Sequence, residues 1–145
     1  GEPRSATFLN DERPPPRLVG VGRQNITCTN GRLIYLGGTI LNESMPLDHP
    51  ARRAVAGISG LTGLIGVDYL HDPETGRATL IEINPRPTTS VVGLVAALGP
   101  GRLAALWIGV AEGTENHDSF PAARPVTPLE FRADGAILSG LTPLL

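Results

Sequence analysis

The sequence of 145 residues contains no lysine, and all twelve of its basic residues are arginine. A compositional drift from lysine to arginine is the simplest explanation, because a composition bias by itself carries no mechanism. Chemistry that depends on a lysine ammonium group must nevertheless come from outside this chain. The G-x-x-x-x-G-K-[ST] motif is absent, which excludes a P-loop enzyme, and no G-x-G-x-x-G follows a predicted strand, as dinucleotide binding would require.

Other absences narrow the class of protein further. The single cysteine, Cys28, cannot form a disulfide framework. No apolar run reaches the roughly 18 residues that a membrane span needs. The net charge is −2 and there is no basic block, so the electrostatic features of a nucleic-acid binder are missing. We therefore expect a cytoplasmic protein whose partners are small molecules or proteins, with no nucleic acid and no membrane.

The length suits one compact domain, and the first residue is not methionine, so the chain is expected to be either a fragment or a natural short protein. Alternating apolar residues and turn signals predict strands and a hairpin centred on Asn30-Gly31, which is the strongest short hairpin signal. The expected strands are residues 5–9, 23–29, 32–36, 64–70, 77–83 and 127–132. Capping residues, glycines and helix formers predict helices at residues 48–57, 91–98 and 102–110.

Two of these strands carry the residues that point to chemistry. Residues two apart on a strand share a face, so Glu82 and Asn84 project together, while Ile81 and Ile83 are expected to face the core. If residues 72–76 close a hairpin, Asp68 lies opposite Glu82 and Asn84. Two carboxylates and an amide oxygen suit Mg²⁺, which keeps several waters and is completed by substrate phosphates.

The same face continues to Arg86, whose planar cation can bind an acyl phosphate or a carboxylate through two hydrogen bonds. There is a plainer interpretation, because acidic residues beside hairpin turns are usually solvated and Asn-Pro is a common turn signal. The order Glu-x-Asn-x-Arg argues against it. From average residue frequencies it should occur by chance in only about one chain in a hundred of this length.

The motif Gly66-Val67-Asp68-Tyr69-Leu70, a turn, and Leu80-Ile81-Glu82-Ile83-Asn84-Pro85-Arg86 resembles the C-terminal metal-binding hairpin of the ATP-grasp superfamily. The resemblance implies an α+β fold, with a largely antiparallel sheet and helices packed on one face. Residues 1–112 would form the C-terminal subdomain, and residues 113–145 would be a loop and strand extension of the same domain.

By the same resemblance, the activity is that of a carboxylate–amine ligase that forms an amide through an acyl phosphate. The resemblance implies ATP and two Mg²⁺ ions, with Mn²⁺ as an alternative, and metal ligation by Asp68, Glu82 and Asn84. It gives Arg86 the catalytic contact to the acyl phosphate or the acceptor carboxylate. An N-terminal ATP-grasp half or a partner chain, with its lysines, is required, and the chain alone is expected to be inactive.

Weaker resemblances add three positions. Leu70 matches the position of the apolar residue under the adenine. Gln24 matches a strand that lines the acceptor site, where an exposed strand residue is the alternative. Thr88, at the start of a predicted helix, can hold an anion together with Thr89 and Ser90 or simply cap that helix.

The string from Glu82 to Leu94 also resembles the branch that contains tyramine–glutamate ligase, of methanofuran biosynthesis, although Pro87 departs from that branch. Two alternatives stay open. One is an ATP-grasp ligase with a different acceptor, and the other is a non-catalytic ATP-grasp-like module that pairs with a partner chain. The donor and acceptor substrates are left undetermined by the sequence.

Overall fold

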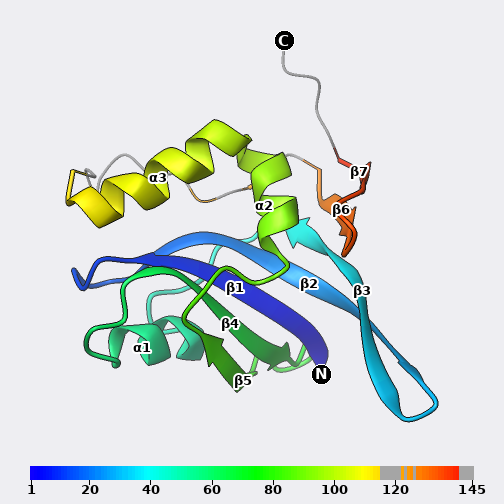
Figure 1. Ribbon diagram of the computed structural model, residues 1–145. Coiled ribbons are helices and arrows are strands. Elements are labelled where there is room, and N and C mark those ends of the chain that lie inside the picture. Colours follow the sequence, from blue (N-terminus) through cyan, green and yellow to red (C-terminus); the bar gives the residue numbers. More distant parts are fainter. Residues whose placement is uncertain (115–121, 123, 126, 141–145) are drawn as a thin grey trace.

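The computed structural model describes residues 1–114, 122, 124–125 and 127–140, so part of the predicted extension at 113–145 lies outside the described residues. Figure 1 shows one sheet flanked by helices. The strands are β1 (Glu2–Asn10), β2 (Arg17–Thr29), β3 (Arg32–Leu41), β4 (Gly63–His71), β5 (Ala78–Asn84), β6 (Leu129–Arg132) and β7 (Ile137–Ser139). The helices are α1 (Pro50–Ala56), α2 (Val91–Leu98) and α3 (Pro100–Glu112).

The strands form a seven-stranded sheet in the order β5-β4-β1-β2-β3-β6-β7, and every neighbouring pair is antiparallel. The expected α+β class with an antiparallel sheet is therefore confirmed. The expectation that the helices pack on one face needs correction. Helix α1 covers one face, while α2 and α3 cover the other (Figure 1). The reason is that the central strands are apolar on both sides.

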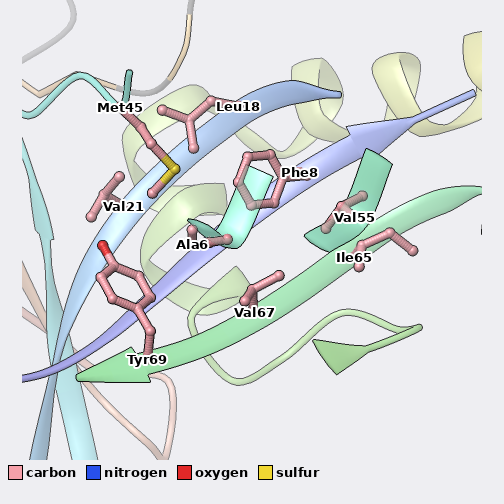
Figure 2. Close-up of a cluster of buried hydrophobic side chains, with 10 residues drawn as sticks. Ala6, Phe8, Leu18, Val21, Met45, Val55, Ile65, Val67 and Tyr69 are labelled. Carbon is pink, nitrogen blue, oxygen red and sulfur yellow. The ribbon is translucent and has the colours of Figure 1, made fainter. Parts of the chain in front are cut away.

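Strand β1 shows this most clearly, because consecutive residues on it enter different cores. Phe8 is fully buried on the α1 side, and Leu9 is buried on the side of α2 and α3. Figure 2 shows the α1-side core, in which Val55 of α1 belongs to the same cluster as Phe8 of β1 and Ile65 of β4. A strand whose two faces are both apolar needs a covering layer on each side.

The β2–β3 hairpin turns where the sequence predicted it. Asn30 and Gly31 both have positive φ, 51° and 74°, as a two-residue hairpin turn requires. The predicted strand ended at residue 36, but β3 continues through Gly37 and Gly38 and pairs with β6 there. A Cβ on Gly38 would lie 3.1 Å from the ring of Phe131, so the glycine permits this close approach.

Helix α1 begins later than predicted and has a different cap. It starts at Pro50, and Nδ1 of His49 accepts the hydrogen bond from the backbone N–H of Ala51 at 3.2 Å. The predicted helix began at Asp48, which lies one residue before this N-cap. Proline is favoured in the first turn because it lacks the N–H that would otherwise be unsatisfied, which explains the later start.

Among the described residues, no single helix is long and apolar enough to cross a membrane. Helices α2 and α3 would qualify as a pair by length and composition only, and a bend of 109° separates them. Each contributes leucines, Leu94 in α2 and Leu103 and Leu106 in α3, to the core on their side of the sheet.

Candidate functional site

The β4–β5 hairpin is closed by an Asp72-based turn. The side chain of Asp72 accepts hydrogen bonds from the backbone N–H of Glu74 at 3.0 Å and the hydroxyl of Thr75 at 2.7 Å. The backbone N–H of Gly76, at a positive φ of 70°, donates to the carbonyl oxygen of Asp72 at 2.8 Å. Such local hydrogen bonds around one aspartate favour a tight turn, as predicted from the sequence.

The register of this hairpin brings the predicted acids together. Asp68 of β4 is paired with Glu82 of β5, and Gly66 is paired with Asn84. Directly paired residues on antiparallel strands project from the same face, so Asp68, Glu82 and Asn84 share the face covered further along by α2 and α3.

The prediction that Ile81 faces the core is wrong, since its side chain is 58% exposed. The pairing shifts between Asp68 and Tyr69, whose partners are Glu82 and Leu80, which leaves Ile81 as the extra residue of a β-bulge on an edge strand. Ile83 does pack against the α1-side core, as expected.

Hydrogen bonds order the acidic pair on both sides. Nδ2 of Asn84 donates to Oε1 of Glu82 at 2.9 Å, and Nε2 of Gln24 donates to Oδ1 of Asp68 at 2.9 Å. Burial, and then the nearby Glu82, raise the pKa of Asp68 to about 6, while Gln24 and Arg86 oppose the rise. The site therefore holds two carboxylates close enough to compete for a proton.

A cleft of about 210 Å³ opens at these residues, and we call it the acid cleft. Its lining includes every predicted site residue except Leu70. The lining residues are Gln24, Tyr35, Asp68, Glu82, Asn84, Arg86, Thr88, Thr89 and Ser90. Leu70 is 37% exposed and lines a second hollow, of about 310 Å³, with Gly1, Asp72, Arg77 and Thr79. The roles given to these residues remain predictions.

The segment after β5 forms one wall of the acid cleft. Arg86 is exposed, and its Nη1 donates to the carbonyl oxygen of Pro87 at 3.3 Å. Ser90 is the N-cap residue of α2, but its side chain makes no capping hydrogen bond. Its Oγ lies 2.8 Å from Oγ1 of Thr88 and 3.5 Å from Oγ1 of Thr7, so the hydroxyls bond one another rather than cap the helix.

Tyr35 of β3 lines the cleft and was missed by the sequence reasoning. Burial, together with the nearby Asp68, raises the pKa of its phenol to about 12, which keeps the hydroxyl protonated and able to donate a hydrogen bond. Counting residues back from the Asn30-Gly31 turn would have found it. That count pairs Tyr35 with Ile26, and Ile26 lies two residues after Gln24 and on the same face of β2.

The donor set of the acid cleft fits a hard divalent cation. Among the described residues there is no group of three or more His, Cys, Asp or Glu side chains arranged for a metal ion. The available donors are two carboxylates and an amide oxygen, which suit Mg²⁺ when substrate phosphates and water complete its coordination. The two adjacent carboxylates repel each other, and a cation between them would remove that repulsion.

Replacement of Asp68 by Asn should change how stability depends on pH. The folded-state pKa of about 6 exceeds the ordinary 3.8, so this carboxyl favours the folded state below pH ~4, and that contribution is lost as the pH rises to about 6. Without metal at about pH 7, Asp68→Asn should raise the free energy of unfolding by on the order of 1–2 kcal/mol, since partial exposure reduces the full effect.

Urea unfolding of both proteins between pH ~4 and ~7.5, in the presence of a chelator, would measure this difference. The exposed Glu74→Gln variant serves as the control and should follow the wild-type curve. If the free energy of unfolding varied with pH in the same way for the wild type and Asp68→Asn, ionisation of Asp68 would not destabilise the folded state.

Comparison with known proteins gives a match to one family by sequence and matches to solved structures by fold. The family model described as "ATP-grasp domain" matches residues 1–90. Among solved structures, the chain is similar in fold to Kluyveromyces lactis urea carboxylase, with a TM-score of 0.60 and 12% identity. It is also similar to K. lactis urea amidolyase, with a TM-score of 0.59 and 11% identity. No curated protein matches the sequence.

Both structural similarities involve most of this chain but only a small part of each of the two larger proteins. They cover 85% of this chain, 11% of the urea carboxylase chain and 8% of the urea amidolyase chain. At these identities the similarity concerns the fold alone.

Proposed function

The chain belongs to the ATP-grasp family, and we propose that it supplies the metal-binding side of an ATP-dependent carboxylate–amine ligase. The observation that carries this proposal is the register of the β4–β5 hairpin, which pairs Asp68 with Glu82 and places Asn84 beside them in the acid cleft. Members of this family are usually ligases and generally use ATP and Mg²⁺.

Asp68, Glu82 and Asn84 are the residues that would hold Mg²⁺. When bound there, the ion would neutralise charge on the phosphate oxygens during phosphoryl transfer. The hydrogen bond from Asn84 to Glu82 orients the glutamate carboxylate. Because Glu82 lies on a strand that is paired with β4, its backbone is also held in place. The protein's contribution at this side of the site is therefore positioning and electrostatics.

Arg86 lines the same cleft, and we propose that it acts on the substrate side. Its side chain is exposed, and its guanidinium donates a hydrogen bond to the backbone carbonyl of Pro87. The guanidinium can therefore turn toward an anion at the cost of this one hydrogen bond. We propose that it binds the acyl phosphate or the acceptor carboxylate before the amine displaces phosphate. Neutral Tyr35 can donate a hydrogen bond from the opposite wall.

Phosphate contacts through lysine must come from elsewhere, because the sequence has none. We propose that an N-terminal ATP-grasp half, in the same polypeptide or in a partner chain, provides them. The hollow at Leu70, lined also by Gly1 and Thr79, would then lie on the adenine side.

The test is substrate-dependent ADP formation by the full-length protein that carries this chain. We expect turnover that requires Mg²⁺ or Mn²⁺, stops when a chelator removes the metal, and depends on both a carboxylate and an amine. ADP formation without an amine, with no amide product, would contradict the ligase assignment. No nucleotide binding at all would favour a non-catalytic module.

For the substrate, we propose glutamate as the amino-acid partner, as in methanofuran-type C1 cofactor synthesis, because the string from Glu82 to Leu94 resembles the tyramine–glutamate ligase branch. A panel of amino acids and aromatic amines, with amide formation followed by mass spectrometry, would test this. Glutamate should give the highest kcat/KM, and a clear preference for another acceptor would place the protein in a different branch.

A further inference from the structure

Gln24 reaches the acid cleft from a strand that is not adjacent to the β4–β5 hairpin. Gln24 is on β2 and Asp68 is on β4, with β1 between them in the sheet. The side chain of Gln24 therefore spans β1 to place its Nε2 2.9 Å from Oδ1 of Asp68.

The residues beneath this span are small. Ser5 of β1 pairs with Asp68 on one side and with Gly22 on the other, and it is only 2% exposed. A Cβ on Gly22 would lie 3.2 Å from Oγ of Ser5, which is closer than most real contacts. With glycine at 22 and serine at 5, the sheet surface stays low enough for the Gln24 side chain to cross it.

We propose that Gln24 is a positioning residue for the metal site, where its N–H holds one oxygen of Asp68 and so fixes the orientation in which this carboxylate would meet a divalent cation beside Glu82. This inference rests on the proposed function. Gln24 lies in the cleft beside the acids and donates to one of them, so it acts through Asp68 rather than on the substrate. Hydrogen-bonding partners of metal ligands fix the ligand's orientation and so tune metal affinity.

The matched variant is Gln24→Met, which keeps the length and approximate volume of the side chain but has no N–H donor. Gln24→Asn keeps the amide but is one methylene too short to span β1. Thr27→Val, an isosteric change further along β2, is the control. Circular dichroism and thermal unfolding should show that all three variants are folded.

Mn²⁺ binding to the full-length protein, with a non-hydrolysable ATP analogue present, would be followed by the electron paramagnetic resonance signal of free Mn²⁺. We expect both Gln24 variants to raise the Kd for Mn²⁺ by about 10-fold. The Mg²⁺ concentration for half-maximal turnover should rise by a similar factor, whereas KM for ATP at saturating Mg²⁺ should change by less than about 2-fold. Thr27→Val should match the wild type.

The outcomes separate the two proposals. If the wild type binds Mn²⁺ and turns over but the Gln24 variants match it, the positioning role is overturned and the proposed function stands. If the variants raise KM for ATP or for an amine at saturating Mg²⁺ without changing the Kd for Mn²⁺, Gln24 is a substrate contact instead. A wild type that binds no Mn²⁺ overturns both proposals.

Discussion

Replacement of Glu82 by Gln should lower Mg²⁺-dependent turnover of the full-length protein by about 100-fold or more, the scale seen when one group that stabilises transferring charge is lost. The change preserves size but removes one of the two carboxylates in the acid cleft. A neutral amide binds Mg²⁺ more weakly than a carboxylate does. The remaining acid, Asp68, would also lose the neighbour that raises its pKa.

The loss should appear as a lower kcat and a higher Mg²⁺ requirement, measured by ADP release across a Mg²⁺ titration. Glu74→Gln makes the same chemical change at an exposed turn residue of the same hairpin and should leave turnover within about 2-fold of the wild type. Unchanged turnover in Glu82→Gln would remove Glu82 from the metal site.

Replacement of Gly93 by Ala should destabilise the fold by about 2–3 kcal/mol. Gly93 lies in α2 where the helix meets the sheet, and a Cβ there would lie 2.5 Å from Cδ1 of Phe131 and 2.6 Å from Cγ1 of Ile40. Both of these side chains are buried, at 2% and 0% exposure, so neither can move aside easily. The higher helix propensity of alanine, worth up to about 1 kcal/mol, offsets only part of this.

Gly101→Ala is the matched control, because Gly101 is also helical but exposed, with nothing within 4 Å of the added methyl group. It should leave stability unchanged or raise it by up to about 1 kcal/mol. Urea unfolding of the two variants beside the wild type would measure both effects. Equal stabilities for Gly93→Ala and Gly101→Ala would mean that α2 is not held closely against β3 and β6.

Much of the site was accessible from the sequence because its components are local. The turn at residues 72–76 and the two-residue periodicity of a strand are enough to predict the hairpin and to put Glu82 and Asn84 on one face. Regular pairing from the turn would place Asp68 opposite Ile81, and the bulge at Ile81 is what pairs Asp68 with Glu82. The hairpin at Asn30-Gly31 followed from the same kind of signal. These features depend on turn residues and strand alternation within about 20 positions of the chain.

The errors arose where contacts between distant segments decide the structure. Ile81 looked like a core residue by alternation, but the bulge opposite Asp68 leaves it exposed on an edge strand. Gly37 and Gly38 looked like the end of a strand, but β6, about 90 residues later in the sequence, pairs with them. Local propensity contains no information about which distant strand will lie alongside.

The sequence alone therefore determined which acids and which asparagine are available, and that lysine is absent, since these depend on residue identity and short spacing. The tertiary structure decided that helices cover both faces of the sheet and that the bulge at Ile81 pairs Asp68 with Glu82. It also decided that Gln24 bonds Asp68 across β1, because only the order of strands in the sheet brings β2 and β4 within one side-chain length of each other.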